Sequence, residues 1–372
     1  MSLNPSYVKV IEVLLLERND DLMHLNIFCK RKRALCIALS IVLSTSVVGC
    51  SLPRKNDSIS KTGFYFNTVI TVTLYDSSKE DLLEDCFSMA DTYEHYFSNT
   101  ISDSDISKIN DADGDYVTVH DETIELLQKG IYYGDLSNGK FDITIGTLSN
   151  LWDFSDKALE KENTSSTSLV PSDTDIKNAL ATVNYKNVKI DGNQAALTNA
   201  DATLDLGGIA KGYIADKMKD YLNENGVTSG IINLGGNILV LGPKDDGNAY
   251  RIGIQKPFDE DGNSIASVSI TDQTVVSSGV YERYFKENGV LYHHILDTST
   301  GYPYDNHLLG VTIITEKSVD GDGLSTTCFA LGLEDGMALI ESLPDTEAIF
   351  ITDDYELHTS SGIGKTIPLE KL

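Results

Sequence analysis

The chain has 372 residues, with 29 Lys and Arg against 56 Asp and Glu, which gives a formal net charge of −27. Apolar residues make up 41% and charged residues 23%, a composition typical of a folded globular protein. The acidity argues against a nucleic-acid partner, because phosphate backbones require clustered basic side chains. The five cysteines include no CxxC pair, which excludes a zinc ribbon or a thioredoxin-type site.

The N-terminal region has the pattern of an export signal. Four basic residues at 30–33 precede fifteen uncharged residues at 34–48, and Gly49-Cys50 follows. A basic cluster before a short apolar stretch is typical of a secretory signal, because fifteen residues are few for a membrane span. The ending VVGC has the pattern of a lipobox, whose cysteine receives a lipid; an ordinary signal peptide that ends near a cysteine is the alternative. We predict that Cys50 is lipidated.

This signal divides the chain into four predicted parts. Residues 1–22 are a doubtful extension, because Met23 stands where a signal peptide should start, and residues 23–49 are the lipoprotein signal peptide. Residues 50–62 are expected to form a lipid-anchored tether, and residues 63–372 one large domain. We therefore expect an exported lipoprotein held to a membrane by its lipid. Its place would be the outer face of the cytoplasmic membrane, which is the periplasmic side if the cell has two membranes.

Hydrophobic periodicity predicts helices and strands that are segregated along the chain. The β-branched and aromatic run 64–75 predicts one strand. Apolar residues at helical spacing predict helices over 78–97, 122–136, 209–225 and 323–333. Short strands between Gly or Asn turns are expected at 231–234, 238–241, 251–255, 266–270, 275–278, 291–296 and 309–315. Segregated elements predict the α+β class, here a single large domain with a largely antiparallel sheet and flanking helices. Cys86 and Cys328 are expected to be buried thiols, although one disulfide is possible.

A double glycine before a predicted helix has the features of an anion site. A short strand over 202–206 is expected to run into Gly207-Gly208 and then into the helix that begins at Ile209. Glycines let a ligand approach the backbone, and a helix N-terminus offers free N–H groups and a positive dipole end. Lys211 could reach the same anion as a point charge. The alternative is a tight strand–helix turn with a lysine in solvent.

Near the C-terminus, Asp322 and Thr326 stand four residues apart. A helix that begins here places both side-chain oxygens on one face. A carboxylate and a hydroxyl suit Mg²⁺, which takes few protein ligands and completes its octahedron with phosphate and water. The alternative is that Asp322 only caps the helix N-terminus, as Asp often does.

Two further segments indicate little on their own. The adjacent His293 and His294 of a predicted strand point to opposite faces, so at most one of them faces a cleft, where it could act as a general base. A histidine in a strand is otherwise structural. The segment GKFDIT at 139–144 is expected to form a turn into a strand that offers an aromatic face and a carboxylate.

Taken together and in this order, these segments resemble the ApbE family of FAD:protein FMN transferases, many of which are exported lipoproteins. The resemblance extends from about residue 62 to about residue 360. Its segments are FDITIGTLSNLW (141–152), DLGGIAKGY (205–213), NLGGN (233–237), SSGVYERYF (277–285), HHILDTSTGYP (293–303) and DGLSTTCFALG (322–332).

The resemblance implies an activity and a set of site residues. FMN would pass from FAD to a threonine hydroxyl of an exported or membrane acceptor protein, with Mg²⁺ present and AMP released. Mg²⁺ would be held by Asp322, Thr326 and the backbone carbonyl of Gly208. Lys211 would act on the diphosphate, and His294 would take the proton of the acceptor hydroxyl. The expected FAD-contacting positions are Phe66, Thr100, Lys140, Phe141, Asp142, Asp205, Lys211 and Ile295.

Two departures from the family pattern leave alternatives open. The family usually has Met-Gly-Thr on its first strand, where this chain has Phe66-Asn67-Thr68, and it often has a Tyr where this chain has Thr100. An aromatic residue lost near the flavin removes stacking of about 1 kcal/mol, which Phe66 could replace. The alternatives are a Mg²⁺-dependent FAD pyrophosphatase that yields FMN and AMP, and a non-catalytic flavin-binding lipoprotein.

Overall fold

The computed structural model describes residues 58–154 and 168–372. The predicted extension 1–22, the signal peptide 23–49, Cys50 and most of the tether lie outside the described residues, so they stay predictions. Within 58–154 and 168–372, no helix has both the length and the apolar character needed to cross a bilayer.

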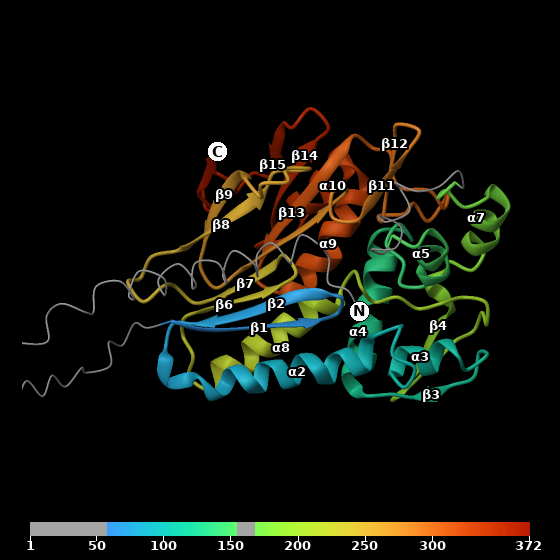
Figure 1. The fold of residues 1–372 in the computed structure, drawn as a ribbon, viewed down its shortest axis with the longest axis horizontal. Helices are drawn as coiled ribbons and strands as arrows, with labels where there is room; N and C mark the ends of the chain where they lie inside the picture. Colours follow the sequence, from blue (N-terminus) through green and yellow to red (C-terminus); the bar gives the residue numbers. More distant parts are fainter. Residues whose placement is uncertain (1–57, 155–167) are drawn as a thin grey trace, which may run out of the picture. The chain divides into compact units, whose positions relative to one another are not determined.

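The centre of the fold is an eight-stranded sheet in which every neighbouring pair is antiparallel (Figure 1). The fold is therefore α+β with a largely antiparallel sheet, as predicted. In spatial order the strands are β1 (Ile59–Tyr65), β2 (Thr68–Leu74), β6 (Gly230–Leu234), β7 (Asn237–Leu241), β10 (Thr274–Gly279), β13 (Leu308–Thr315), β14 (Glu347–Thr352) and β15 (Leu357–Thr359).

Helices cover one face of this sheet (Figure 1). They are α2 (Asp81–Phe97), α8 (Ala210–Glu224), α9 (Ser318–Leu331) and α10 (Leu333–Ser342). Helix α8 packs on β6 and β7, and α9 packs on β10 and β13, so that the two helices meet over the middle of the sheet. A large apolar core lies between sheet and helices. Because α9 is buried on nearly all sides, its polar residues must find partners within the protein.

A second, three-stranded sheet covers the opposite face of the main sheet. Its strands are β8 (Tyr250–Gln255), β9 (Ser264–Ile270) and β16 (Leu369–Lys371). Side chains from both sheets form one apolar cluster, for example Val275 and Ile314 with Ile252 and Val268. Strands β10 and β13 are therefore buried on both faces, and they hold α9 on a rigid support.

The remaining elements include α5 and the segment that precedes it. They are η1 (Ser77–Lys79), α3 (Asp105–Asn110), β3 (Val117–Thr118), α4 (Asp121–Leu136), α5 (Gly146–Trp152), α7 (Asp173–Leu180), η2 (Tyr185–Asn187), β4 (Val188–Asp191), β5 (Gln194–Leu197), β11 (Tyr284–Glu287) and β12 (Val290–His293). Backbone hydrogen bonds from Asp205 N to Ile143 O (2.8 Å) and from Gly146 N to Thr203 O (3.0 Å) join this segment to the chain before α8.

The predicted single strand over 64–75 is wrong. The chain forms a hairpin instead, with β1 paired to β2 and a turn at Phe66-Asn67, whose φ angles are 53° and 55°. The continuous aromatic and β-branched run conceals this turn, because neither residue is the glycine that positive φ usually selects. Strand β1 also begins at Ile59, so the folded part starts inside the predicted tether 50–62.

Four other element predictions need correction. Neither 202–206 nor 139–144 forms a strand, and a single bridge joins Thr203 to Ile145, just after the second stretch. The predicted strand 291–296 ends at His293. The helix predicted from 323 begins at Ser318, so Asp322 lies inside α9, and the alternative that it caps the helix is wrong.

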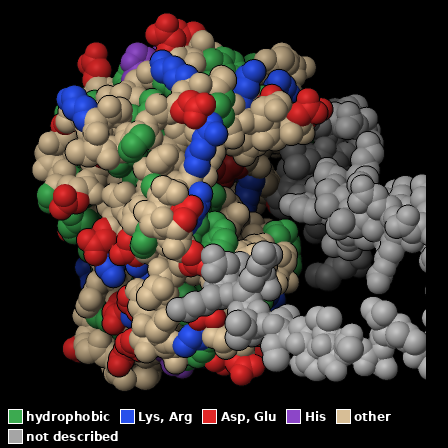
Figure 2. Space-filling view, turned by 90° about the vertical axis from the view of Figure 1, so that its left-hand side faces the viewer, with side chains coloured by type: hydrophobic (Ala, Val, Ile, Leu, Met, Phe, Trp, Pro, Cys, Tyr) green, Lys and Arg blue, Asp and Glu red, His purple; other side chains and the backbone are tan. Residues whose placement is uncertain are grey.

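The two cysteines among the described residues, Cys86 and Cys328, are buried free thiols, as expected. On the face in Figure 2, acidic side chains intermingle with lysines and arginines and do not form one patch of a single sign. In this view the acidic residues are therefore spread over the surface.

Candidate active site

Gly207 and Gly208 connect the loop that ends at Leu206 to the first turn of α8. Asp205 Oδ1 accepts a hydrogen bond from Gly207 N (2.8 Å), which closes a tight turn. Gly207 and Gly208 are both exposed. A Cβ on Gly208 would lie 3.2 Å from the Phe141 ring, so the absence of a side chain leaves room for this approach. The glycine turn just before α8 is therefore open to a ligand, whereas Ile209 and Ala210, where the helix begins, are buried.

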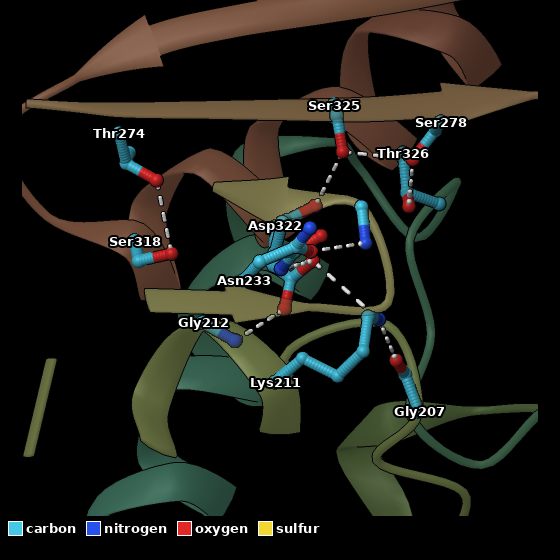
Figure 3. A network of polar contacts seen from close by, with 12 residues as sticks. Gly207, Lys211, Gly212, Asn233, Thr274, Ser278, Ser318, Asp322, Ser325 and Thr326 are labelled. Atoms are coloured by element: carbon cyan, nitrogen blue, oxygen red, sulfur yellow. Dashed lines mark hydrogen bonds and ion pairs between the residues drawn. The ribbon is translucent and has the colours of Figure 1, made fainter. Parts of the chain in front are cut away.

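Asp322 lies at the centre of a polar network between α8, α9 and β7 (Figure 3). Its Oδ2 accepts a hydrogen bond from Gly212 N (2.6 Å), and its Oδ1 accepts one from Asn237 Nδ2 (2.6 Å). Lys211 Nζ lies 3.7 Å from the same Oδ1 and donates to Gly207 O (3.3 Å). Asp322 is 4% exposed, so this carboxylate is held by buried donors and one lysine.

Thr326 joins the network one helical turn after Asp322 (Figure 3). Its hydroxyl lies 3.3 Å from Ser278 Oγ, which in turn lies 2.8 Å from Ser325 Oγ. Ser325 Oγ donates to the backbone carbonyl of Asp322 (2.9 Å). Thr326 is half-buried, whereas Ser325 and Thr327 are fully buried. The structure thus brings Lys211, Asp322 and Thr326 together.

Burial and the neighbouring donors shift the pKa of Asp322 in opposite directions. Burial raises the pKa of its carboxyl, while Lys211, Asn237 and the Gly212 N–H lower it. An anionic carboxylate in this position depends on these neighbours. A cation that approached Asp322 would favour the same charged form.

His294 lies just beyond β12 and is half-buried. Its backbone N donates to Arg283 O (3.1 Å), and its Nδ1 lies 3.3 Å from the same oxygen. Burial lowers the pKa of this imidazole to about 3, with further lowering by the charges of Arg283 and Lys211. His294 is therefore neutral near pH 7, and the lowered pKa also makes it a weaker base than a free imidazole. Because the charge of Lys211 acts on the His294 imidazole, His294 lies on the side of the molecule that carries the Asp322 network.

His293 has a structural environment. It is 4% exposed, its Nε2 lies 2.9 Å from Tyr304 O, and Ile295 N donates to its Nδ1 (3.3 Å). Burial lowers the pKa of His293 to about 4. The two adjacent histidines thus have different surroundings, and of the two His294 is the one that keeps access to solvent.

The other predicted flavin positions fall into two groups. Near Phe141, the Asp142 carboxylate accepts hydrogen bonds from Thr144 N (2.7 Å) and Tyr185 N (2.8 Å), so it holds its own loop. Lys140 Nζ donates to Ala330 O at the end of α9 (3.2 Å). Ile295 is buried.

The second group lies at the C-terminal end of α2. Phe66 N donates to Glu94 Oε1 (2.6 Å), which fixes the β1–β2 turn against α2. Thr100 is exposed, and its hydroxyl lies 3.0 Å from Ser98 Oγ. Phe66 and Thr100 therefore flank the same helix end, and among the described residues no hydrogen bond joins their side chains to the Asp322 network.

Sequence reasoning missed four residues of the site. Asn237 and Gly212 bind Asp322 directly, and Ser278 bonds to Thr326. Asn237, Gly212 and Ser278 belong to the motifs NLGGN, DLGGIAKGY and SSGVYERYF, so their positions were visible but their partners were not. Glu282, the fourth, is exposed, and the charges of Lys211 and Arg283 lower the pKa of its carboxyl while that of Asp322 raises it.

The fold and this network define an α+β protein with a polar site at a helix N-terminus, suited to a phosphate-bearing ligand. The ApbE family matches residues 66–350 of the chain, and the chain belongs to this family. A FAD:protein FMN transferase of Klebsiella pneumoniae (strain 342) is 37% identical over 295 residues, which cover 78% of this chain and 88% of the relative. Another, of Treponema pallidum (strain Nichols), is 30% identical over 348 residues, which cover 88% and 93%.

Solved structures of the same family share the fold. The ApbE protein of Thermotoga maritima superposes with a TM-score of 0.73 at 29% identity, over 82% of this chain and 97% of that one. The flavin transferase ApbE of Vibrio cholerae superposes with a TM-score of 0.72 at 26% identity, over 82% and 98%. Both matches cover nearly the whole of the solved chain.

Proposed function

We propose that this protein transfers the FMN moiety of FAD to a threonine hydroxyl of an acceptor protein and releases AMP. One observation carries the proposal: an ammonium, a carboxylate and a hydroxyl from distant parts of the chain, at Lys211, Asp322 and Thr326, belong to one network at the N-terminus of α8. The names of the relatives support the same activity, since each of the two sequence relatives described above is a FAD:protein FMN transferase.

The available oxygen donors fit Mg²⁺. Asp322, Thr326 and the backbone carbonyl of Gly208 would hold the ion, because carboxylate, hydroxyl and carbonyl oxygens are its preferred protein ligands. Among residues 58–154 and 168–372 no group of three His, Cys, Asp or Glu could hold a metal, so a cation here would keep water and diphosphate oxygens as further ligands. When bound, Mg²⁺ would neutralise charge on the diphosphate.

The chain's own residues have separate roles in the proposed step. Lys211 binds the diphosphate as a point charge beside the exposed glycine turn that precedes α8. His294 takes the proton of the acceptor threonine, whose oxygen forms a new bond to the phosphorus of the FMN half. The bond from that phosphorus to the bridging oxygen breaks, and AMP leaves with the electron pair. Positioning and charge neutralisation supply most of the catalysis in such a transfer.

Hydrolysis of FAD to FMN and AMP is the second candidate, with water in place of the threonine. The exposed Thr100 leaves this candidate open, because the position offers no aromatic ring to hold a flavin. A flavin-binding lipoprotein without activity is the third candidate, but such a protein has no need of Asp322 and Thr326 beside a diphosphate-binding lysine.

We also propose the location and organisation predicted from the N-terminal sequence. Cys50 would carry a lipid that anchors the domain at the outer face of the cytoplasmic membrane, where exported or membrane acceptor proteins are reached. Mass determination of the membrane-extracted protein tests this, because a chain that begins at a diacylated Cys50 has a defined mass. An unmodified mature N-terminus would disprove the anchor without affecting the proposed chemistry.

One assay separates the three candidate functions. The domain is incubated with FAD and Mg²⁺, with and without a threonine-containing acceptor domain, and AMP, free FMN and flavin-labelled protein are measured. Transfer produces AMP only with the acceptor, together with labelled protein. Hydrolysis produces AMP and FMN without the acceptor. Bound FAD with no AMP in either case identifies a carrier.

A further inference from the structure

A groove distinct from the Asp322 network runs between α2, α4 and α8. It is a hollow of about 390 Å³, lined by tyrosine rings, by Met89 and by the carboxylates of Asp85 and Glu122. The tyrosines are Tyr93, Tyr96 and Tyr221. The proposed function does not use these residues.

Two hydroxyl groups of this groove have no hydrogen-bonding partner among the described residues. Most of Tyr93 is buried, but its hydroxyl stays open to the groove and makes no hydrogen bond within the described part of the chain, and the same holds for Tyr96. The carboxylate of Glu122 has no ion pair there either. Glu122 lines the groove together with Tyr93 and Tyr96. One face of the Tyr96 ring stacks on His120, with ring centres 3.7 Å apart, and no lysine or arginine of residues 58–154 or 168–372 pairs with Glu122. Such a surface is complementary to a positively charged side chain.

The protein itself shows this type of contact one turn away. Lys217 Nζ bonds to Glu125 Oε2 (2.9 Å) and lies 4.9 Å from the centre of the Tyr213 ring. Tyr213 packs edge-to-face on Tyr93, with ring centres 6.0 Å apart. Beside the groove, then, a carboxylate and a tyrosine already bind an intramolecular ammonium. In the groove the same two types of group receive no ammonium from the described part of the chain.

The dimensions and position of the groove favour a peptide over a small cation. From Asp85 to Tyr96 it follows eleven residues of α2, or about 16 Å, which matches about five residues of extended chain. Its Tyr96 end adjoins Glu94, which holds the Phe66 turn, and the segment that carries Thr100. A chain that lies in the groove would therefore lead to the helix end flanked by the two predicted flavin positions.

We propose that this groove binds an extended segment of the acceptor protein that carries arginine or lysine, with the cationic side chains between the tyrosine rings and the carboxylates of Asp85 and Glu122. The inference rests on the proposed function for the identity of the partner. Its chemistry, a cationic peptide on an aromatic and acidic surface, can be tested separately.

The test measures binding of a fluorescein-labelled peptide of alternating arginine and glycine, which contains no threonine, to the full-length protein in detergent. The variant Asp85→Asn/Glu122→Gln removes both charges and keeps the side-chain shapes. The amide oxygen of the new asparagine can still accept from the Tyr221 hydroxyl, as the Asp85 carboxylate does. We expect at least about tenfold weaker binding by fluorescence anisotropy, since two ion pairs with the peptide are lost beside the aromatic rings.

The control removes two charges from another hollow. Glu334 and Glu341 line a groove between α10 and β15, so Glu334→Gln/Glu341→Gln changes the net charge equally. We expect this variant to bind the peptide within about twofold of the original protein, because distant surface charges are screened by salt. A loss as large as in the first variant, or equal binding of a peptide with glutamate in place of arginine, would overturn the proposal. If free arginine methyl ester, at the same concentration as the peptide, displaces it, the groove binds a small cation and the peptide proposal is wrong.

The same variants distinguish this inference from the proposed function. Asp85→Asn/Glu122→Gln should bind FAD as the original protein does, and the arginine peptide should inhibit transfer to an acceptor without displacing FAD. If the original protein releases no AMP from FAD with any acceptor, the proposed function fails, while the peptide measurement still stands. If transfer occurs and the peptide leaves it unaffected, the groove is not the acceptor site.

Discussion

Gly212 of α8 lies directly against the backbone of Ser318 at the start of α9. A Cβ on Gly212 would be 2.2 Å from Ser318 O, a distance that no side chain tolerates. The same turn of α8 donates its Gly212 N–H to Asp322, and Asp216 one turn later accepts from the N–H groups of Ser318 and Val319 (2.8 and 2.9 Å). The network can therefore form only because α8 and α9 pack closely enough for the Gly212 N–H to reach Asp322.

Gly212→Ala should force α8 and α9 apart. Since the obstacle is backbone, we expect a loss of folding free energy of about 2 kcal/mol or more, measured by urea denaturation. Asn223→Ala, an exposed position of the same helix, is the control and should change stability by less than about 0.5 kcal/mol. Equal stability of Gly212→Ala and the original protein would contradict the close contact.

Asp322→Asn should remove the metal-dependent part of ligand binding. With ADP as a diphosphate probe, the melting temperature of the original protein should rise further when Mg²⁺ is added and fall back with EDTA, because a ligand stabilises only the state that binds it. The variant should respond to ADP with no further rise on adding Mg²⁺. A normal Mg²⁺ response in Asp322→Asn would remove this carboxylate from the proposed metal site.

His294→Ala should keep FAD binding and lose transfer, by about 10² to 10⁴-fold in kcat, if the imidazole takes the acceptor proton. Burial lowers the pKa of His294 to about 3, so the free enzyme already holds the neutral base above about pH 5. The kcat/KM of the original protein should therefore show no decline due to His294 between pH 8 and pH 5. Unchanged turnover by His294→Ala would exclude this role.

His293→Gln should weaken the pH dependence of stability. Burial lowers the pKa of His293 to about 4, below the value of about 6.5 in an unfolded chain. The unfolded chain therefore takes up the proton first, so the stability contributed by neutral His293 is present above about pH 6.5 and is lost as pH falls toward 4. A glutamine can still donate to Tyr304 O but does not titrate. The slope of unfolding free energy against pH in this window should fall by up to about 1.4 kcal/mol per pH unit.

His307→Gln provides the contrast. Asp353 raises the pKa of this exposed histidine, so its contribution is present at low pH and is lost as pH rises. Its removal should change the slope in the opposite sense to His293→Gln. Chemical denaturation at several pH values measures both variants, and slopes that change in the same sense would contradict the assigned environments.

Local patterns predicted much of the fold. Helix α8 was expected over 209–225 and spans Ala210–Glu224, because its apolar spacing ends at Gly226, whose φ is 78°. The short strands of the C-terminal half also lie where Gly and Asn turns separate apolar runs. Such features depend on residues a few positions apart, which a sequence displays directly.

The errors arose where distant residues decide local structure. Helix α9 begins at Ser318 because Asp216, about a hundred positions earlier, binds its first N–H groups. The turn at Phe66-Asn67 lacks glycine and is held by Glu94. Neither partner can be identified from the segment that it controls.

By itself the sequence determined the α+β class, the order of the motifs, and the family to which they belong, because each is carried by short stretches of chain. Only the tertiary structure decided that Asn237 and the Gly212 N–H bind Asp322, that Asp142 holds its own loop, and that tyrosine rings and carboxylates line a groove along α2. Hydrogen bonds and burial between remote segments depend on how strands and helices pack. That packing is a property of the whole chain, which no single motif encodes.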